Sequence, residues 1–325
     1  MTTASVTIHE SQFPENVRRD LLASLHRRQV NHKFLYDSFK QTQKWLALHE
    51  AHSPARTDAD CLTTYDRAFR AAARKLSASR IHVVGLGCGG GQKDTRLLAL
   101  LRRPGRQLFY TPSDVSVAMA LVARQAARKI LPAQNCFPFV CDLATAEDLP
   151  AIGAAHRAPR TARLVTFFGL IPNFEPEEIL PKLAALVRPA DWLLLGANFA
   201  PGADYAAGVA RILPQYDNAL TRDWLLAFLD DLGVARGDGQ LRFTVEANAA
   251  GLRRVVARFH FARRSRVTAE AEEFHFTAGD SLRLFFSYRY TPELVKTALA
   301  RHGLQIQARW ITQSEEEGVF LCCRG

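Results

Sequence analysis

Short apolar runs alternate with amphipathic stretches through the first two thirds of the chain. Strands are predicted by the apolar runs at 81–86, 107–111, 136–140, 163–168 and 192–195. The stretches between them place apolar residues at helical spacing and predict helices. Because strands that alternate with helices are typical of a mostly parallel sheet, we expect an α/β fold with a crevice at the carboxyl ends of its strands.

The pattern changes after Pro201. The next region is predicted to be largely helical, over 205–232. Alternating apolar and polar positions then predict an antiparallel layer with strands at 241–246, 252–263, 274–276 and 282–288. A well-capped helix over 290–302 and a hairpin of 305–311 with 319–323 complete the prediction.

The segment before the first predicted strand is expected to form helices and a covering element. Three leucines share one face of a helix predicted over 13–28. The stretch 30–57 has no strict periodicity, and we expect it to cover the sheet rather than to join it. Thr57 and Asp60 have the spacing of a capping box for a helix over 58–76.

A glycine-rich turn follows the first predicted strand of the sheet. Gly87, Gly89, Gly90 and Gly91 allow the backbone to approach a ligand closely, at torsions that other residues avoid. Such a turn also occurs in plain strand-to-helix connections, so by itself it does not identify a nucleotide site. Residues at the ends of the next strands can distinguish a nucleotide site from a plain strand-to-helix connection.

Acidic residues stand at the ends of the second and third predicted strands. Asp114 is placed to accept hydrogen bonds from both ribose hydroxyls, because one carboxylate can take both. It is also suited to cap the helix that begins near Ser116, and the two roles are compatible. Asp142 occupies the corresponding position after the third strand. A dinucleotide dehydrogenase explains the turn and Asp114, whereas a methyltransferase also explains Asp142 and the terminal hairpin.

Composition narrows the class of protein. At 325 residues and 48% hydrophobic residues, the chain has room for a large core and a flanking subdomain. The N-terminus lacks a signal peptide and no apolar run is long enough to span a bilayer, so we expect a cytoplasmic protein with no membrane partner. The six cysteines include no CxxC pair, and we expect no metal site.

The net charge of +10 raises the question of a nucleic-acid partner. The basic residues are scattered in short clusters, and no recognition helix or aromatic RNA-binding strand is evident. We therefore expect an arginine-rich surface, and no nucleic acid as partner.

A series of motifs covers most of the chain and carries a family resemblance. These motifs are KFLYD (33–37), SPART (53–57), GLGCGGGQKDTRLL (85–98), YTPSDVS (110–116), FFG with NFEPEE (167–178), RPADWLLLGANF (188–199), QYDNA (215–219), FTAGDSL (276–282) and SYRYTPE (287–293). By these motifs the sequence resembles the histidine α-N-methyltransferases of ergothioneine biosynthesis, which use S-adenosylmethionine (SAM).

The resemblance implies a fold and a division into domains. It implies a class I, Rossmann-like SAM methyltransferase with a mostly parallel sheet. An α+β substrate-binding domain would consist of the N-terminal segment and an insertion after the fifth strand, at 1–60 and 201–287. The SAM-binding domain would then comprise 61–200 and 288–325. The implied reaction is methylation of the α-amino group of a free amino acid, with S-adenosylhomocysteine as product, and we expect a monomer.

The resemblance also assigns roles to single residues. It implies that Gly87, Lys93, Asp114 and Asp142 contact the cofactor, together with the amide of Leu143. Tyr36 would close over the cofactor and approach the reacting amine. It further implies that Gly169, Asn173 and Tyr216 hold the amino and carboxylate groups of the substrate, with Ser287 beside its side chain.

The departures from the family pattern concern the substrate's side chain. The histidine enzymes carry an imidazole-binding glutamate two residues before a serine, and this chain has Phe285 before Ser287. A carboxylate accepts a ring N–H, whereas phenylalanine offers only an apolar face. A family tyrosine corresponds to His52, and the loop 169–173 is one residue shorter. These changes favour an apolar or aromatic amino acid over histidine.

Other interpretations remain open at this stage. Phe285 suits a strand core, His52 a solvated loop, Tyr216 a helix anchor and Lys93 a solvated helix start. The alternative functions are methylation of histidine itself, methylation of nucleic acid or protein, and ligand binding without catalysis. The nucleic-acid and glutamine enzymes commonly carry a [DN]PP[YF] loop after the fourth strand, and Pro172-Asn173-Phe174 does not match it. Sequence does not identify the proton acceptor; Tyr36 or water is the hypothesis.

Overall fold

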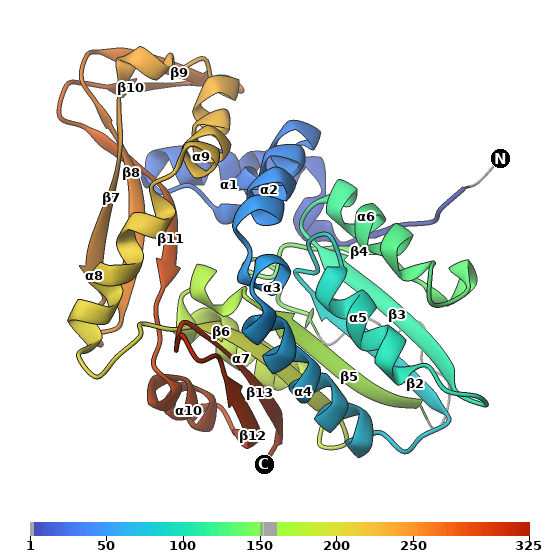
Figure 1. Ribbon diagram of the computed structural model, residues 1–325. Coiled ribbons are helices and arrows are strands. Elements are labelled where there is room, and N and C mark those ends of the chain that lie inside the picture. Colours follow the sequence, from blue (N-terminus) through green and yellow to red (C-terminus); the bar gives the residue numbers. More distant parts are fainter. Residues whose placement is uncertain (1–2, 150–151, 153–160) are drawn as a thin grey trace.

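The computed structural model describes residues 3–149, 152 and 161–325. Its larger part is an eight-stranded sheet flanked by helices, and a smaller part with its own antiparallel sheet stands over one end of it (Figure 1). The predicted α/β sheet and the predicted antiparallel layer are both present.

Strands of the large sheet run in the order β1 (Thr7–Ile8), β4 (Phe139–Val140), β3 (Gln107–Asp114), β2 (Arg80–Leu86), β5 (Thr161–Phe168), β6 (Trp192–Asn198), β13 (Glu317–Arg324) and β12 (Leu304–Ile311). Neighbouring strands are parallel except at β13, which is antiparallel to both β6 and β12. The chain order reverses beside β2, and at such a switch point an open α/β sheet forms its ligand crevice.

Helices cover both faces of this sheet because its buried strands are apolar on both sides. One face packs against α4 (Ala59–Lys75), α5 (Gln92–Leu101) and α6 (Val117–Ala127). The other face packs against α7 (Pro176–Leu186) and α10 (Pro292–Arg301). Successive residues Leu193, Leu194 and Leu195 of β6 enter the two cores alternately, so one strand supports both layers.

The smaller part is built on a three-stranded antiparallel sheet with the order β11 (Ser281–Tyr288), β8 (Arg253–Phe261) and β7 (Gly239–Ala247). A separate hairpin of β9 (Ser265–Ala269) and β10 (Glu272–Phe276) extends from it. The helices of this part are α1 (Pro14–His26), α2 (Phe39–His52), α8 (Tyr205–Tyr216) and α9 (Ala219–Asp231). They bring the N-terminal segment and the segment after residue 200 together around one apolar core.

Some local features differ from the prediction. The stretch expected to cover the sheet contributes no strand to it, as predicted, but it contains α2, whose start carries a capping box of Ser38 and Gln41. The sequence did not predict this helix, because few of its residues are buried and it therefore has no clear apolar stripe. The N-cap of α4 is Asp58, not Thr57, because Pro54–Thr57 form a short helical turn, α3, of their own.

The edges of the sheets also differ from the prediction. The third predicted strand contains only Phe139–Val140, and β1 and β9 were not predicted at all. A two-residue strand such as β1 has no periodicity to detect. The cap Thr291, the first-turn Pro292 and Gly303 at φ +73° are confirmed around α10. No helix in the described part of the chain is long and apolar enough to cross a membrane.

Candidate active site

One cavity of about 1210 Å³ lies between the carboxyl ends of the parallel strands and the antiparallel layer. Its walls include β11, α2 and the glycine turn. All the site residues predicted from sequence line this one cavity: Tyr36, His52, Gly87, Lys93, Asp114, Asp142, Leu143, Gly169, Asn173, Tyr216, Phe285 and Ser287. The fold thus brings together residues that are up to about 250 positions apart in sequence.

The glycine turn after β2 forms part of the cavity floor. Gly87 and Gly89 have φ angles of +57° and +51°, in the left-handed region that favours glycine. A Cβ on Gly87 would lie 2.2 Å from Cδ2 of Leu170, and one on Gly89 would lie 2.9 Å from the Trp45 ring. The turn is therefore glycine-rich because the conformation and the close packing of Leu170 and α2 both require it.

Asp114 ends β3 beside this turn. Its Oδ2 accepts the amide N–H of Gly89 at 2.9 Å, and its Oδ1 accepts that of Ser116 at 3.1 Å. Burial raises the pKa of its carboxyl to about 6, although these N–H donors favour the ionised form. The helix cap of α6 is the Ser116 side chain, not Asp114. Asp114 is thus a desolvated carboxylate on the cavity wall that is suited to hydroxyl donors.

Asp142 is held by the N-terminal segment. Its Oδ1 accepts the amide N–H of Ala144 at 2.9 Å, while its Oδ2 lies 3.2 Å from Nδ2 of Asn31 and 3.6 Å from Nζ of Lys33. Its own amide donates to the Ser11 hydroxyl oxygen at 3.0 Å. These contacts fix the carboxylate and the neighbouring Leu143 at the edge of the cavity, and they connect the sheet to the segment before α2.

Lys93 belongs to a buried polar network rather than to the solvent. Its Nζ donates to Oη of Tyr65 at 2.7 Å and lies 3.2 Å from Oε1 of Glu317. The Tyr65 hydroxyl also donates to Glu317. Burial alone would raise the pKa of Glu317, but Lys93 and Tyr65 outweigh burial and hold it below its ordinary value. The interpretation of Lys93 as a solvated helix start was wrong.

Tyr36 lies between two tryptophans. Its ring centroid is 6.0 Å from that of Trp45 on α2 and 5.3 Å from that of Trp224 on α9. Its backbone oxygen accepts the Thr42 hydroxyl at 2.9 Å. Burial and the nearby Asp114 carboxylate raise the pKa of the phenol far above its ordinary value, so Tyr36 stays protonated near neutral pH.

The loop after β5 connects the two parts of the site. Gly169 has a φ of +67°, and nothing lies within 4 Å of where its Cβ would be. Asn173 ends the short 3-10 helix η6 (Ile171–Asn173), and its Nδ2 donates to the backbone oxygen of Phe286 on β11 at 2.9 Å. That bond leaves the Asn173 side-chain oxygen as the acceptor that the loop offers to a ligand.

Tyr216, at the end of α8, is part of a chain of hydrogen bonds on the opposite wall. Its hydroxyl donates to Oγ of Ser287 at 2.8 Å and accepts Nη2 of Arg289 at 2.7 Å. The Arg289 guanidinium carbon also lies 5.2 Å from the centre of the Tyr216 ring. The predicted pair Tyr216 and Ser287 is therefore in direct contact, and Arg289 joins them.

Phe285 is enclosed by aromatic rings. It is 7% exposed and stacks on His32 with a centroid separation of 5.2 Å and an interplanar angle of 14°. Trp224 meets it edge-on at 5.6 Å, and the Tyr216 ring lies 6.2 Å away. It is a core residue that also lines the cavity, as its structural interpretation predicted, and its contact with a substrate stays a prediction.

His32 presents a neutral imidazole to the same wall. Its Nε2 accepts the amide N–H of Phe286 at 3.3 Å, which places the ring proton on Nδ1. Burial, followed by the positive charges of Arg283 and Arg254, lowers the pKa of His32 to about 3. At neutral pH this wall therefore carries an uncharged ring rather than a cation.

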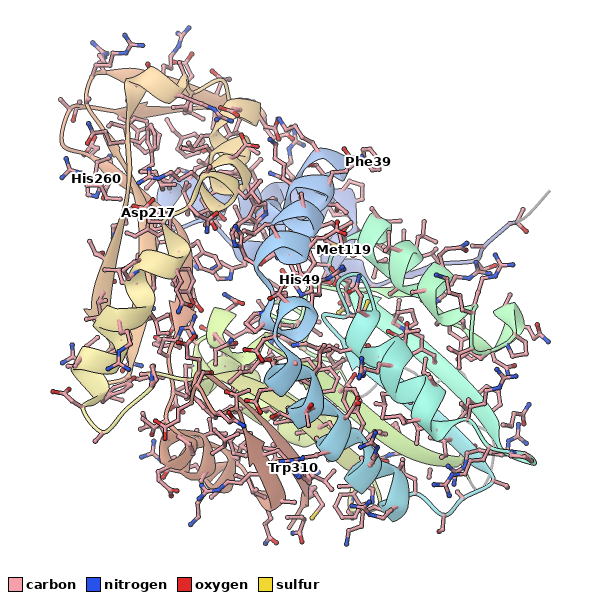
Figure 2. The ribbon with its side chains drawn as sticks, in the orientation of Figure 1. Phe39, His49, Met119, Asp217, His260 and Trp310 are labelled. Carbon is pink, nitrogen blue, oxygen red and sulfur yellow. The ribbon has the colours of Figure 1, made fainter. Side chains whose placement is uncertain are left out.

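His52 lies at the exposed end of α2, at the mouth of the cavity. One turn earlier, His49 also lines the cavity and stacks on Trp45 at 4.7 Å. Figure 2 shows His49 between the two parts of the molecule. Burial, with the nearby Lys93 charge, lowers the pKa of His49 to about 4. Two histidines of α2 therefore border the cavity, and only one of them was predicted.

Several cavity residues had no distinct sequence signal: His32, Trp45, His49, Trp224, Arg289 and Glu317. Trp45 and Trp224 occur on helices whose cavity-facing sides do not show in the pattern. Arg289 follows Phe285 and Ser287 at strand spacing and lies in the SYRYTPE motif, and these two features could have indicated it.

Comparison with known proteins gives consistent matches along the chain. A family model described as "Histidine-specific methyltransferase, SAM-dependent" matches residues 17–324. The chain is 27% identical to the histidine N-alpha-methyltransferase of Mycolicibacterium smegmatis and 24% identical to that of Mycobacterium tuberculosis, and each match covers 95% of both chains. It is also similar to a solved SAM-bound amino pentose methyltransferase from Micromonospora echinaspora, at 18% identity and a TM-score of 0.39, over 89% of this chain and 99% of that one.

Proposed function

The chain belongs to the family of SAM-dependent, histidine-specific methyltransferases, and from this premise we propose that it methylates the α-amino group of a free amino acid other than histidine, with an apolar or aromatic side chain. That it is a SAM-dependent methyltransferase with a Rossmann-like sheet follows from the family match and the observed topology. The identity of the acceptor is the proposal.

The surroundings of Phe285 are the observation that supports an apolar or aromatic side chain on the substrate. Phe285 lines the cavity and is packed among His32, Trp224 and Tyr216. At this position the cavity presents an aromatic ring, where the family's histidine enzymes present a carboxylate. An imidazole N–H placed against the Phe285 ring would find no hydrogen-bond acceptor in that side chain, whereas an apolar ring would gain contact area.

The residues present fit the cofactor. Gly87 and Gly89 of the left-handed turn line the cavity with backbone alone, and the desolvated Asp114 carboxylate offers acceptors beside them. We propose that Gly87, Asp114 and Asp142 hold the cofactor with Leu143, and that Lys93 lies at its methionine end. When bound, SAM supplies an electrophilic methyl group on a sulfonium; an N–C bond forms as the S–C bond breaks, leaving S-adenosylhomocysteine.

The chain's own contribution to catalysis is alignment and exclusion of water. Gly169 and Asn173 would orient the amine, and Tyr36 would cover it from the side of α2. Because Tyr36 remains a protonated phenol near neutral pH, it is poorly suited to take the ammonium proton as a base. We therefore favour water as the acceptor of that proton, with Tyr36 as a positioning residue.

The two sheets and their helices support separate domains for binding the substrate and for binding SAM. We propose that 1–60 and 201–287 form the substrate-binding domain, and that 61–200 and 288–325 form the SAM-binding domain. The cavity between them is bordered by α2 and β11 on one side and by the glycine turn on the other. A substrate bound there would be covered by the N-terminal segment.

Histidine is the second candidate substrate, because both curated relatives are histidine N-alpha-methyltransferases. Their identities of 27% and 24% leave room for a different acceptor. A transfer assay with SAM labelled in its methyl group tests the class of acceptor. We expect the label in small molecules when free amino acids are supplied. Label that precipitates with protein or nucleic acid would contradict the proposal, and no transfer at all would favour a ligand-binding protein.

A further inference from the structure

Arg289 is a buried cation that lines the cavity. The residue is 7% exposed, and it follows the last position of β11. Its backbone is held on both sides, because its amide donates to the Arg253 oxygen at 2.9 Å and its own oxygen accepts the Tyr205 hydroxyl at 2.7 Å. The next residue, Tyr290, donates its amide to Asn198 at the end of β6. The guanidinium is therefore anchored where the antiparallel layer joins the parallel sheet.

The charge of Arg289 has no counter-charge in the described part of the protein. Its side chain donates to the neutral hydroxyl of Tyr216, and no carboxylate among residues 3–149, 152 and 161–325 forms an ion pair with it. Its Nε is buried and has no hydrogen-bond partner. A desolvated guanidinium without an anion is costly, and buried charges are normally paired. The arrangement indicates that a ligand supplies the missing anion.

Two anions are available in the proposed reaction: the carboxylate of the amino-acid substrate and that of the cofactor's methionine moiety. Arg289 contacts Tyr216, which contacts Ser287, and both residues lie on the wall that contains Phe285. Lys93 instead lies at the start of α5, directly after the glycine turn. The placement with Tyr216 and Phe285 favours the substrate.

On the basis of the proposed function, we propose that Arg289 binds the α-carboxylate of the substrate, next to the Tyr216 hydroxyl. A guanidinium offers several N–H donors in one plane and matches the two oxygens of a carboxylate. Tyr216 holds one edge of the guanidinium, so its free donors are oriented before the substrate arrives. Arg289 then selects α-amino acids over the corresponding amines and amides, and it fixes which nitrogen faces the methyl donor.

The test compares each methylated amino acid with its carboxamide in four proteins. Steady-state methylation is measured with the twenty standard amino acids and their carboxamides, in the wild type, Arg289→Gln, Arg289→Lys and Arg242→Gln. Arg242 is an exposed arginine of β7 outside the cavity, so Arg242→Gln removes the same charge elsewhere in the layer. Circular dichroism and S-adenosylhomocysteine affinity report whether each variant is folded.

We expect Arg289→Gln to raise the KM of the amino acid about 30-fold, which corresponds to about 2 kcal/mol at 1.4 kcal/mol per tenfold. The KM of the carboxamide should change less than threefold. Arg289→Lys should recover part of the preference for the carboxylate, and Arg242→Gln should match the wild type.

Three results would overturn the assignment. An unchanged preference for the carboxylate in Arg289→Gln would exclude the role. A selective rise in the KM of SAM would mean that the cofactor supplies the anion. Equal losses for amino acid and carboxamide, not recovered by Arg289→Lys, would indicate a structural role only. Failure of the proposed function looks different, because the wild type would then methylate histidine alone or no amino acid in the panel.

Discussion

The imidazole of His32 lies nearly parallel to the ring of Phe285, with centroids 5.2 Å apart and planes 14° apart. The two residues come from opposite ends of the chain, and together they form an uncharged aromatic pair that lines the cavity. His32 is held by the Phe286 amide, so the stack is fixed by a backbone hydrogen bond as well as by packing. The character of this wall is the main reason to expect an acceptor other than histidine.

Changing Phe285 to Glu should create the acceptor that an imidazole requires. We expect Phe285→Glu to bind histidine at least tenfold more tightly in calorimetry with S-adenosylhomocysteine present, because a charge-assisted hydrogen bond contributes about 1.5–3 kcal/mol. Phe285→Leu is the matched control, since it removes the ring without adding an acceptor. Equal histidine affinity in both variants would show that Phe285 does not face the substrate's side chain.

His32 should make the protein less stable in mild acid. Its pKa is about 3 when folded and about 6.5 when unfolded, so the unfolded chain binds the extra proton between these values. The free energy of unfolding therefore falls as the pH drops below 6.5, and this group contributes no pH dependence above pH 7. His32→Gln keeps an acceptor for the Phe286 amide but does not titrate. Urea unfolding at pH 7 and pH 4.5 should show a loss smaller by about 2–3 kcal/mol in His32→Gln than in the wild type.

The pKa of His49 is also lowered, so His49 destabilises the wild type and His32→Gln alike in acid. The quantity that reports on His32 is therefore the difference between the two proteins in their loss of unfolding free energy. His275, exposed on β10, provides the matched control His275→Gln. If both variants lose as much stability as the wild type between pH 7 and pH 4.5, His32 is not neutral in the folded protein.

Asp114 should make cofactor binding depend on pH near 6. Burial raises the pKa of its carboxyl to about 6, and only the ionised form offers all its oxygen lone pairs to hydroxyl donors. Below pH 6, the Kd of S-adenosylhomocysteine should rise by about tenfold per pH unit, and above pH 7 it should be constant. Calorimetry from pH 5 to pH 8 measures this, and Asp114→Asn should bind weakly with a flat profile.

Asp37 offers a control for this titration, because it is an acidic residue close in sequence to Tyr36 that is exposed and does not line the cavity. Asp37→Asn should keep the pH dependence of the wild type. A flat wild-type profile, or a profile that Asp37→Asn abolishes, would remove Asp114 from the cofactor site.

Gly87 should be required for cofactor binding because it leaves space at the cavity floor, and not only because its φ is positive. Its alanine would carry a strained φ of +57° and a Cβ 2.2 Å from Leu170, at the cavity floor. Gly105 has a similar φ of +73° with nothing near its Cβ, so Gly105→Ala carries only the strain. Thermal unfolding should show a loss of about 1–2 kcal/mol for the strain in both variants. Only Gly87→Ala should weaken S-adenosylhomocysteine binding, by at least tenfold, and equal binding in both variants would contradict this assignment.

The parallel sheet was predictable because its strands are buried on both faces and appear as continuous apolar runs. The glycine turn, Asp114 and Asp142 were found for a related reason: chain direction places the ends of parallel strands at one edge. The family motifs predicted that Tyr216, Phe285 and Ser287 belong to one site, and the structure places them in contact on one wall of the cavity.

Features that depend on tertiary contacts were not predictable. The ion pair of Lys93 with Glu317 joins residues more than 200 positions apart, and neither residue shows its burial in the local pattern. The stacking of His32 on Phe285 and the burial of the Arg289 charge likewise depend on contacts between segments that are far apart in sequence. Each depends on how the N-terminal segment and the inserted layer close over the sheet.

Mass spectrometry of the twenty standard amino acids after incubation with the purified protein and SAM tests the central claim most directly. We expect mass gains in steps of one methyl on one or more apolar or aromatic amino acids, and little or none on histidine. Methylation of histidine alone would contradict the proposed specificity, and the absence of any mass gain would contradict the proposed class of substrate.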